Sequence, residues 1–253
     1  MKKPSAKQRK QHLLTIFNAA VSAVSGQQAV EYAIDNDSAY DPETIIAVGK
    51  AAVGMCRGAL NRFPNVQQAF VVTKYNHADE DILSRQNVTV RETAHPVPDS
   101  QSLRAGAELC SLVQSLSADS KLLLLVSGGA SALSESLPDG MSLEDLQAIT
   151  DDMLSTGQTI GQINSRRKEF SQIKDGKLLA QFKGAEIRVY AISDVEGDSI
   201  ATIGSGLGDC HRTSVKAHSS IIASNQISRE KAQAIATGLD LKVKLNEETL
   251  YGD

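Results

Sequence analysis

The chain contains no tryptophan, and aromatic residues make up only 4% of its 253 residues. Proteins that bind single-stranded nucleic acid stack the bases on aromatic side chains, so this scarcity counts against that class. The net charge is −4, which gives no bulk attraction to nucleic acid or to an anionic membrane surface. We therefore expect neither nucleic acid nor a membrane as a partner.

Cysteine and long apolar runs are also scarce. Cys56, Cys110 and Cys210 are an odd number without close spacing, which indicates reduced thiols in a cytoplasmic protein rather than a disulfide framework or a zinc site. No apolar run approaches the roughly 18 residues of a membrane span. Residues 1–12 begin with a basic stretch that no apolar region follows, so we expect a lead-in to the first helix and not a secretory signal.

Apolar strands alternate with amphipathic helices along the rest of the chain. Strands are predicted at residues 44–48, 69–73, 88–91, 122–126, 187–192, 221–224 and 241–245. Helices are predicted from about residue 8 and at 27–34, 51–63, 100–113, 142–154, 160–170, 176–182 and 225–237. This alternation predicts an α/β fold with a doubly wound, mostly parallel sheet and helices on both faces.

Three local patterns refine this prediction. The helix at 51–63 is expected to be buried through Ala52, Met55, Ala59 and Phe63, and the helix at 100–113 through Leu103, Ala107, Cys110 and Val113. Ser100 can cap the second of these helices. Ser142 with Asp145 resembles a capping box at the start of the helix at 142–154.

One stretch combines a buried strand with a glycine turn. Residues 122–131 read Leu-Leu-Leu-Leu-Val-Ser-Gly-Gly-Ala-Ser, and the apolar run is typical of a strand that is buried on both faces. Glycines after such a strand let backbone N–H groups approach a phosphate, and a following helix presents its positive end. The predicted phosphate-binding residues are Ser127, Gly128, Gly129, Ala130 and Ser131. A strand-to-helix turn without a ligand is the alternative.

Polar residues follow three other strands. Lys50 comes one glycine after the strand at 44–48, Asp194 closes the strand at 187–192, and Asn225 follows the strand at 221–224. In doubly wound folds, ligands bind outside these carboxyl ends. A lysine there can reach a phosphate, and an aspartate can hold Mg²⁺ or accept a hydroxyl proton. The alternatives are a surface lysine and ordinary cap or turn residues.

Further candidates lie in a helix and a loop. Asn164 and Lys168 share one face of the helix at 160–170, and Arg167 beside them is suited to bidentate binding of a carboxylate or phosphate. A solvated basic face is the alternative. His95 lies in a loop braced by two prolines, where it can contact substrate. No Walker motif is present, and the glycines of residues 204–208 lack the lead-in strand and spacing of a dinucleotide fingerprint.

Six segments, taken in order, resemble the MOFRL-type glycerate 2-kinases, some of which are named hydroxypyruvate reductase. They are Val48-Gly-Lys-Ala-Ala-Val-Gly-Met55, Val71-Val-Thr-Lys-Tyr75, His95-Pro-Val-Pro-Asp99, Ser127-Gly-Gly-Ala-Ser-Ala132, Ile163-Asn-Ser-Arg-Arg-Lys168, and Ala191-Ile-Ser-Asp194 with Gly197-Asp198. Each segment alone is a weak signal, but six in this order are specific. The resemblance extends over nearly the whole of residues 13–253.

The resemblance implies the Rossmann-like amino-terminal domain of an enzyme that phosphorylates D-glycerate at its 2-hydroxyl with ATP and Mg²⁺. Lys50 and Asp194 fall on the catalytic positions, and Asp194 is also the expected metal ligand. The glycine loop would hold phosphate, and Asn225, from its position after a strand, is expected to bind the nucleotide. The expected substrate-binding residues are Arg167, Lys168, Asn164 and His95.

The chain also departs from the pattern of this family. It ends where the carboxy-terminal MOFRL domain would begin, so we expect weak or no activity alone and association with a second copy or with such a domain. Residues 204–211 replace an Ala-Ser-Gly-Pro-Thr loop, Asp175 stands where a second glycine is usual, and Glu196 adds charge beside Asp194.

The sequence is also compatible with two other functions. One is a non-catalytic module that binds a phosphate or nucleotide after loss of its partner domain. The other is an NAD-dependent hydroxypyruvate reductase, against which the lack of a well-placed dinucleotide fingerprint counts.

Overall fold

A computed structural model describes residues 5–37, 40–158 and 160–245 of the chain. Within these residues, six strands form one sheet in which every neighbouring pair is parallel, in the order β3-β2-β1-β4-β5-β6. The strands are β1 (Thr44–Val48), β2 (Gln68–Lys74), β3 (Val88–Thr93), β4 (Lys121–Val126), β5 (Glu186–Ile192) and β6 (Lys216–Ala223). The predicted doubly wound α/β fold is therefore confirmed.

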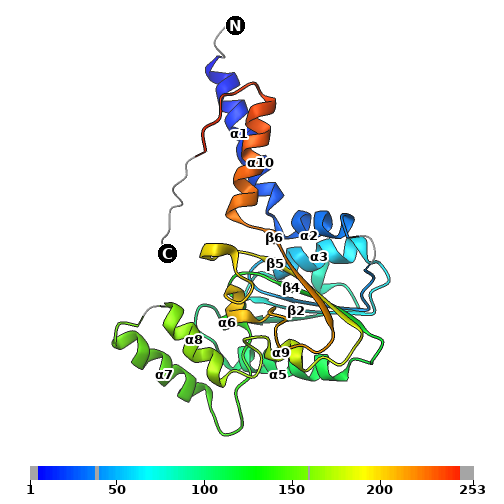
Figure 1. The fold of residues 1–253 in the computed structure, drawn as a ribbon, viewed down its shortest axis with the longest axis vertical. Coiled ribbons are helices and arrows are strands. Elements are labelled where there is room, and N and C mark those ends of the chain that lie inside the picture. The colour runs from blue at the N-terminus through cyan, green and yellow to red at the C-terminus, as the bar shows by residue number, and fades with distance from the viewer. Residues whose placement is uncertain (1–4, 38–39, 159, 246–253) are drawn as a thin grey trace.

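Helices cover both faces of the sheet. They are α1 (Ala6–Ala23), α2 (Gly26–Asp35), α3 (Ala52–Arg62), α4 (Glu80–Leu83), α5 (Ser100–Ser115), α6 (Ala130–Leu133), α7 (Leu143–Ser155), α8 (Ile160–Phe170), α9 (Lys177–Ala180) and α10 (Asn225–Gly238), with short 3₁₀ segments η1 (Glu196–Asp198) and η2 (Ile203–Gly206). Figure 1 shows α2 and α3 on one side of the sheet and α5 and α9 on the other. In the same view, α1 and α10 form a pair that extends beyond the sheet, and α7 and α8 lie at the opposite end of the molecule.

The central strand β4 contributes side chains to both layers. Leu122, Leu124 and Val126 belong to the apolar cluster that contains α5 and α9, whereas Leu123 and Leu125 belong to the cluster that contains α2 and α3. All five are buried. A run of consecutive apolar residues is what a strand covered on both faces requires.

The local predictions had mixed outcomes. Ala52, Met55, Ala59 and Phe63 are buried as expected, and Ser142 and Asp145 exchange the hydrogen bonds of a capping box.

The prediction for α5 was wrong in two respects. Asp99, not Ser100, caps the helix through its side chain. The buried face contains Ser102, Ala105, Gly106, Leu109 and Val113, while Ala107 is exposed and Leu103 and Cys110 are only half-buried. The face is displaced because Gly106 and Ser102 allow the backbone of the segment after α6 to approach α5 closely.

The strand predicted at residues 241–245 is not a strand. These residues follow α10, which packs along α1 and leads the chain away from the sheet, so they do not reach the open edge of β6. The strand predicted at residues 221–224 was too short, because β6 begins five residues earlier, at Lys216. Its first half is polar because β6 is an edge strand with one side open to solvent.

Helix α1 begins at Ala6, with Ser5 and Gln8 forming a capping box. It therefore starts two residues earlier than predicted, inside the expected lead-in. Leu13 and Phe17 remain 67% and 64% exposed on its surface. Across the part of the chain that is described, no helix combines the length and hydropathy needed to cross a bilayer.

The strand order places the functional region. The chain runs from β1 outward to β3 and then returns to the other side of β1 with β4, so the order reverses between β1 and β4. Ligands of open α/β sheets bind outside the carboxyl ends of the strands at such a switch point. The turns after β1 and β4 carry Lys50 and the glycine loop.

Candidate active site

The turns after β1 and β4 are locked together by hydrogen bonds. Ser127 donates its backbone N–H to Val48 O (3.0 Å) and accepts at its Oγ from the N–H of Ala51 (3.1 Å). Lys50 donates its backbone N–H to Gly128 O (2.9 Å). The Ser127 hydroxyl is thus committed to the protein backbone, and it fixes the positions of Lys50 and the glycine loop relative to each other.

Asp194 lies directly against the glycine loop. A Cβ atom built on Gly128 would be only 1.9 Å from Asp194 Oδ2 and 2.6 Å from its Cγ. Only glycine therefore leaves room for this carboxylate, which reaches the loop from the neighbouring strand β5 and is otherwise exposed. The structure thus brings together two residue sets that are more than 60 positions apart in the sequence.

Gly129 contacts the other two predicted side chains. A Cβ atom on it would lie 3.0 Å from His95 Cδ2, 3.1 Å from His95 Nε2 and 3.2 Å from Lys50 Cγ. Gly129 also has φ = +86°, a conformation that side-chain-bearing residues rarely adopt. Lys50, His95, Asp194 and the two glycines therefore form one cluster at the carboxyl edge of the sheet.

The electrostatic environment keeps His95 neutral. Burial lowers its pKa below the ordinary value of 6.5, the cations Lys50 and Lys74 lower it further, and Asp194 opposes the shift. The imidazole is therefore uncharged at neutral pH and can serve as a hydrogen-bonding group rather than as a cation. Since the unfolded chain protonates this residue near its ordinary pKa, acidification through that range favours the unfolded state.

This environment gives a signed prediction for His95. Lys50→Met should raise the pKa of His95 toward its ordinary value because a neighbouring cation is lost, whereas Asp194→Asn should lower it further. The measurement is an NMR titration of the Cε1–H resonances, with His95 assigned through His95→Gln and His218 on β6 as the internal reference. Equal pKa values for His95 in all three backgrounds would contradict the proposed proximity of these charges.

The glycine loop offers unpaired backbone donors. Within the described residues, the N–H groups of Gly128 and Gly129 donate to no protein acceptor, although Gly128 is buried. Buried backbone donors are normally satisfied, so two free ones at a switch point suit a ligand with anionic oxygens. The helix that follows, α6, is only four residues long. The expected contribution of a helix dipole is therefore small, and the N–H groups and Lys50 must supply the positive potential.

Arg167 shares a pocket with the three residues that follow His95, Pro96–Pro98. Its side chain is only 7% exposed and lines a pocket of about 180 Å³ with Pro96, Val97, Pro98 and residues of α7. Its Nε has no hydrogen-bond partner among the described residues. Burial lowers the pKa of Arg167, while the carboxylate of Glu135 opposes this change. A buried guanidinium with a free N–H donor can bind a carboxylate or a phosphate.

The other predicted residues are less closely associated with the cluster. Ser131 Oγ shares a hydrogen bond with Ser205 Oγ (2.9 Å), and Lys168 Nζ donates to Ala201 O (2.7 Å). Both therefore hold residues 199–206 against α6 and α8. Asn225 is exposed in the first turn of α10, where it lines a pocket of about 430 Å³ with Val195–Asp198. Asn164 belongs to α8, but its side chain lies outside the part that the structure describes.

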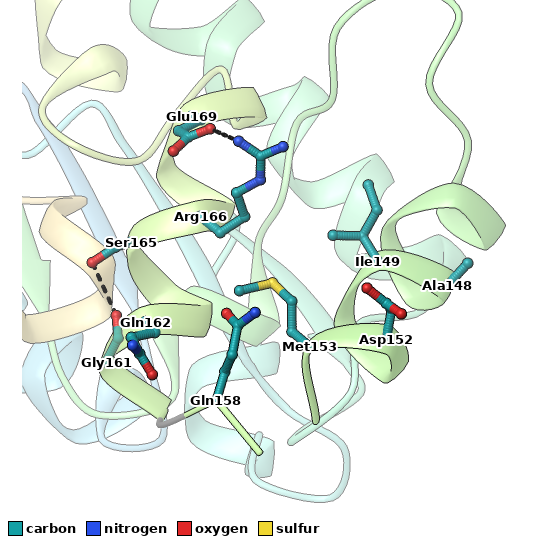
Figure 2. A pocket seen from close by; sticks show the side chains of 10 residues that line it. All are labelled: Ala148, Ile149, Asp152, Met153, Gln158, Gly161, Gln162, Ser165, Arg166 and Glu169. Carbon is teal, nitrogen blue, oxygen red and sulfur yellow. Dashed lines mark hydrogen bonds and ion pairs between the residues drawn. The ribbon is translucent and has the colours of Figure 1, made fainter. Parts of the chain in front are cut away.

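A larger hollow of about 1010 Å³ lies between α7 and α8 (Figure 2). None of the predicted site residues lines it. Its Arg166 is paired with Glu169, as the dashed line in Figure 2 shows. Because the hollow contains none of the groups at the switch point of the sheet, we do not assign the site to it.

Three features of the region escaped sequence reasoning. Lys74 lies at the carboxyl end of β2 within electrostatic reach of His95, and the rule that selected Lys50 applies to it equally. Glu135 and Lys174 form a fully buried ion pair, for which the sequence holds no local signal. Asp175 has φ = +56° and an ion pair with Arg212 (2.5 Å), which explains how an aspartate takes a place usually held by glycine.

Comparison with known proteins identifies the family. A family described as a domain of unknown function, DUF4147, matches residues 12–240. The chain belongs to this family. Its relatives bear out the predicted resemblance to glycerate 2-kinases and hydroxypyruvate reductases.

Two curated relatives and one crystal structure illustrate the similarity. A glycerate 2-kinase of Pyrococcus horikoshii is 40% identical over 162 residues, which cover 64% of this chain and 36% of that protein. An Agrobacterium vitis protein with the provisional name hydroxypyruvate reductase is 33% identical over 231 residues, 89% of this chain and 51% of that protein. The crystal structure of a Thermotoga maritima glycerate kinase matches with a TM-score of 0.82 at 26% identity, covering 92% of this chain and 63% of that one. The chain thus spans about half or less of the curated relatives that it matches.

Proposed function

We propose that this chain carries the catalytic groups of an ATP-dependent kinase that phosphorylates D-glycerate at its 2-hydroxyl, giving 2-phosphoglycerate. The observation that carries the proposal is the contact of Asp194 with the glycine loop, beside Lys50, at the switch point of the sheet. The names of the family members similar to it support the same reaction.

The cluster supplies what phosphoryl transfer requires. Such reactions depend on positioning and on neutralising charge on the transferred group. The free N–H groups of Gly128 and Gly129 and the ammonium of Lys50 are placed to hold the phosphates of ATP. Asp194 takes the proton of the 2-hydroxyl while the hydroxyl oxygen forms a bond to the γ-phosphorus of ATP. The bond between this phosphorus and the bridging oxygen breaks at the same time, and ADP leaves with that oxygen. Arg167 binds the carboxylate of the acceptor.

The residues present also fit Mg²⁺. Mg²⁺ in kinases is commonly held by one or two carboxylates together with substrate phosphates, not by a cage of protein ligands. Asp194 offers exposed carboxylate oxygens next to the phosphate loop, and the described residues contain no cluster of three or more metal-ligating side chains. When bound, Mg²⁺ would neutralise charge on the phosphates.

A nicotinamide-dependent reductase has less structural support. The glycines of residues 204–208 lie in and after the 3₁₀ segment η2, and a Cβ on Gly204 would be 3.0 Å from the Cβ of Ala130. Gly206 and Gly208 likewise approach Asp175 and Val189 closely, so these glycines serve close packing. They do not form the strand-turn-helix arrangement that binds a dinucleotide.

The test is phosphoryl transfer by the purified chain with ATP, Mg²⁺ and D-glycerate, with the product identified by ³¹P NMR. We expect 2-phosphoglycerate, formed slowly under single-turnover conditions and lost in Lys50→Ala. If the chain alone is inactive, adding the carboxy-terminal domain of a relative should restore transfer. Oxidation of NADH with hydroxypyruvate, or binding of ATP with no transfer in either arrangement, would reject the kinase in favour of the reductase or of a binding module.

A further inference from the structure

The segment that follows the glycine loop is fixed to strand β3 and helix α5. Thr93 Oγ1 donates to Leu133 O (2.8 Å), and the N–H of Glu135 donates to Ser102 O in α5 (3.1 Å). A Cβ on Gly106 of α5 would lie only 1.9 Å from Glu135 O. The backbone of Glu135 is therefore held tightly, and the four-residue helix α6 separates it from the glycine loop.

The side chain of Glu135 reaches the carboxyl end of α8. It is fully buried, forms an ion pair with the equally buried Lys174, and accepts a hydrogen bond from Ser171 Oγ (2.5 Å). The N–H of Ser171 in turn donates to Arg167 O (3.1 Å) in the last turn of α8. A second bond, from Gln172 N to Ser136 O (2.7 Å), ties the same two segments together.

The charges in this region do not balance. Arg167 and Lys174 are two buried cations, and the carboxylate of Glu135 attracts both. Burial lowers the pKa of each cation, and Glu135 opposes the shift in each case. Glu135 contacts Lys174 directly, whereas Arg167 keeps its Nε free toward the pocket beside the His95 loop.

We propose that Glu135 is a positioning residue which, bound to Lys174 and Ser171, fixes the last turn of α8 and so holds the guanidinium of Arg167 at a set distance from the glycine loop. This inference rests on the proposed function, because it assigns Arg167 the carboxylate of the acceptor acid. It gives Glu135 a role in acceptor binding and none in the binding of ATP. A residue that serves folding alone would affect both ligands, or neither, once the fold is restored.

The test needs a variant that keeps the fold. Glu135→Gln alone leaves Lys174 buried without a partner, which is strongly destabilising. The double variant Glu135→Gln/Lys174→Met removes the ion pair as a whole and keeps similar volumes. Its melting curve, compared with that of the wild type, establishes that it folds. Glu169→Gln is the matched control, because Glu169 is exposed and pairs only with Arg166 among its described ion pairs. Arg167→Met provides the limiting case for loss of the guanidinium.

Two measurements decide the proposal. Calorimetry should show that the double variant binds D-glycerate about 10- to 100-fold more weakly, while ATP affinity is unchanged in both the double variant and Glu169→Gln. The ¹⁵N heteronuclear NOE of Arg167 Nε–Hε, measured without ligand and assigned through Arg167→Met, should fall in the double variant and stay unchanged in Glu169→Gln.

An unchanged NOE in a folded double variant would overturn the positioning role, as would unchanged D-glycerate binding. If the wild type binds no D-glycerate at all, the proposed function fails. In that case the NOE comparison still decides whether Glu135 orders Arg167.

Discussion

Asp194→Asn is expected to slow phosphoryl transfer by about 10²- to 10⁴-fold, the usual contribution of a positioned proton acceptor. Asparagine has the same shape, so the contact with Gly128 and the fold should be preserved while the carboxylate is lost. The affinity for ATP should change little, since Lys50 and the free N–H groups of the loop remain. The measurements are single-turnover transfer to D-glycerate and calorimetric titration with ATP.

Glu196→Gln is the matched control, because Glu196 is an exposed acid two residues further along the same loop. It should transfer phosphate at the wild-type rate. Gly128→Ala should reproduce the loss seen in Asp194→Asn, since its added Cβ would occupy the position of the Asp194 carboxylate. If Asp194→Asn were as fast as Glu196→Gln, the proton-accepting role would be rejected. A higher Mg²⁺ requirement with an unchanged maximal rate would assign Asp194 to the metal alone.

The fold and the centre of the site could be predicted because both follow from local rules. An uninterrupted apolar run such as residues 122–126 identifies a strand buried on both faces. In a parallel sheet, all carboxyl ends meet at one edge. Lys50, the glycine loop and Asp194 could therefore be expected to lie together from their positions after strands.

The parts that could not be predicted depend on long-range packing. The sequence around Glu135 gives no indication that Lys174, 39 positions later, neutralises it in the interior. Asn225 also follows a strand, but it lies at the edge strand β6, two strands away from β4, and so lines a different pocket. The strand expected at residues 241–245 failed because apolar periodicity cannot show whether a sheet edge is within reach.

The locking of the two turns predicts a large effect on stability at Gly49. This glycine has φ = +134°, and an added Cβ would lie 2.1 Å from Ser127 Oγ and 2.6 Å from Ser127 O. Gly49→Ala should therefore combine backbone strain with a clash against the serine that joins β1 to β4, and lower the free energy of unfolding by about 3 kcal/mol or more.

Two other glycines separate these causes. Gly140 has φ = +85° with open space around it, so Gly140→Ala isolates the strain and should cost about 1–2 kcal/mol. Gly238, at the end of α10, has neither strain nor a close neighbour, so Gly238→Ala should stabilise the chain by about 0.5–1 kcal/mol. Urea denaturation followed by circular dichroism ranks the three variants. A Gly49→Ala variant no less stable than Gly140→Ala would mean that Ser127 can move away, and that the turns carrying Lys50 and the glycine loop are not rigidly joined.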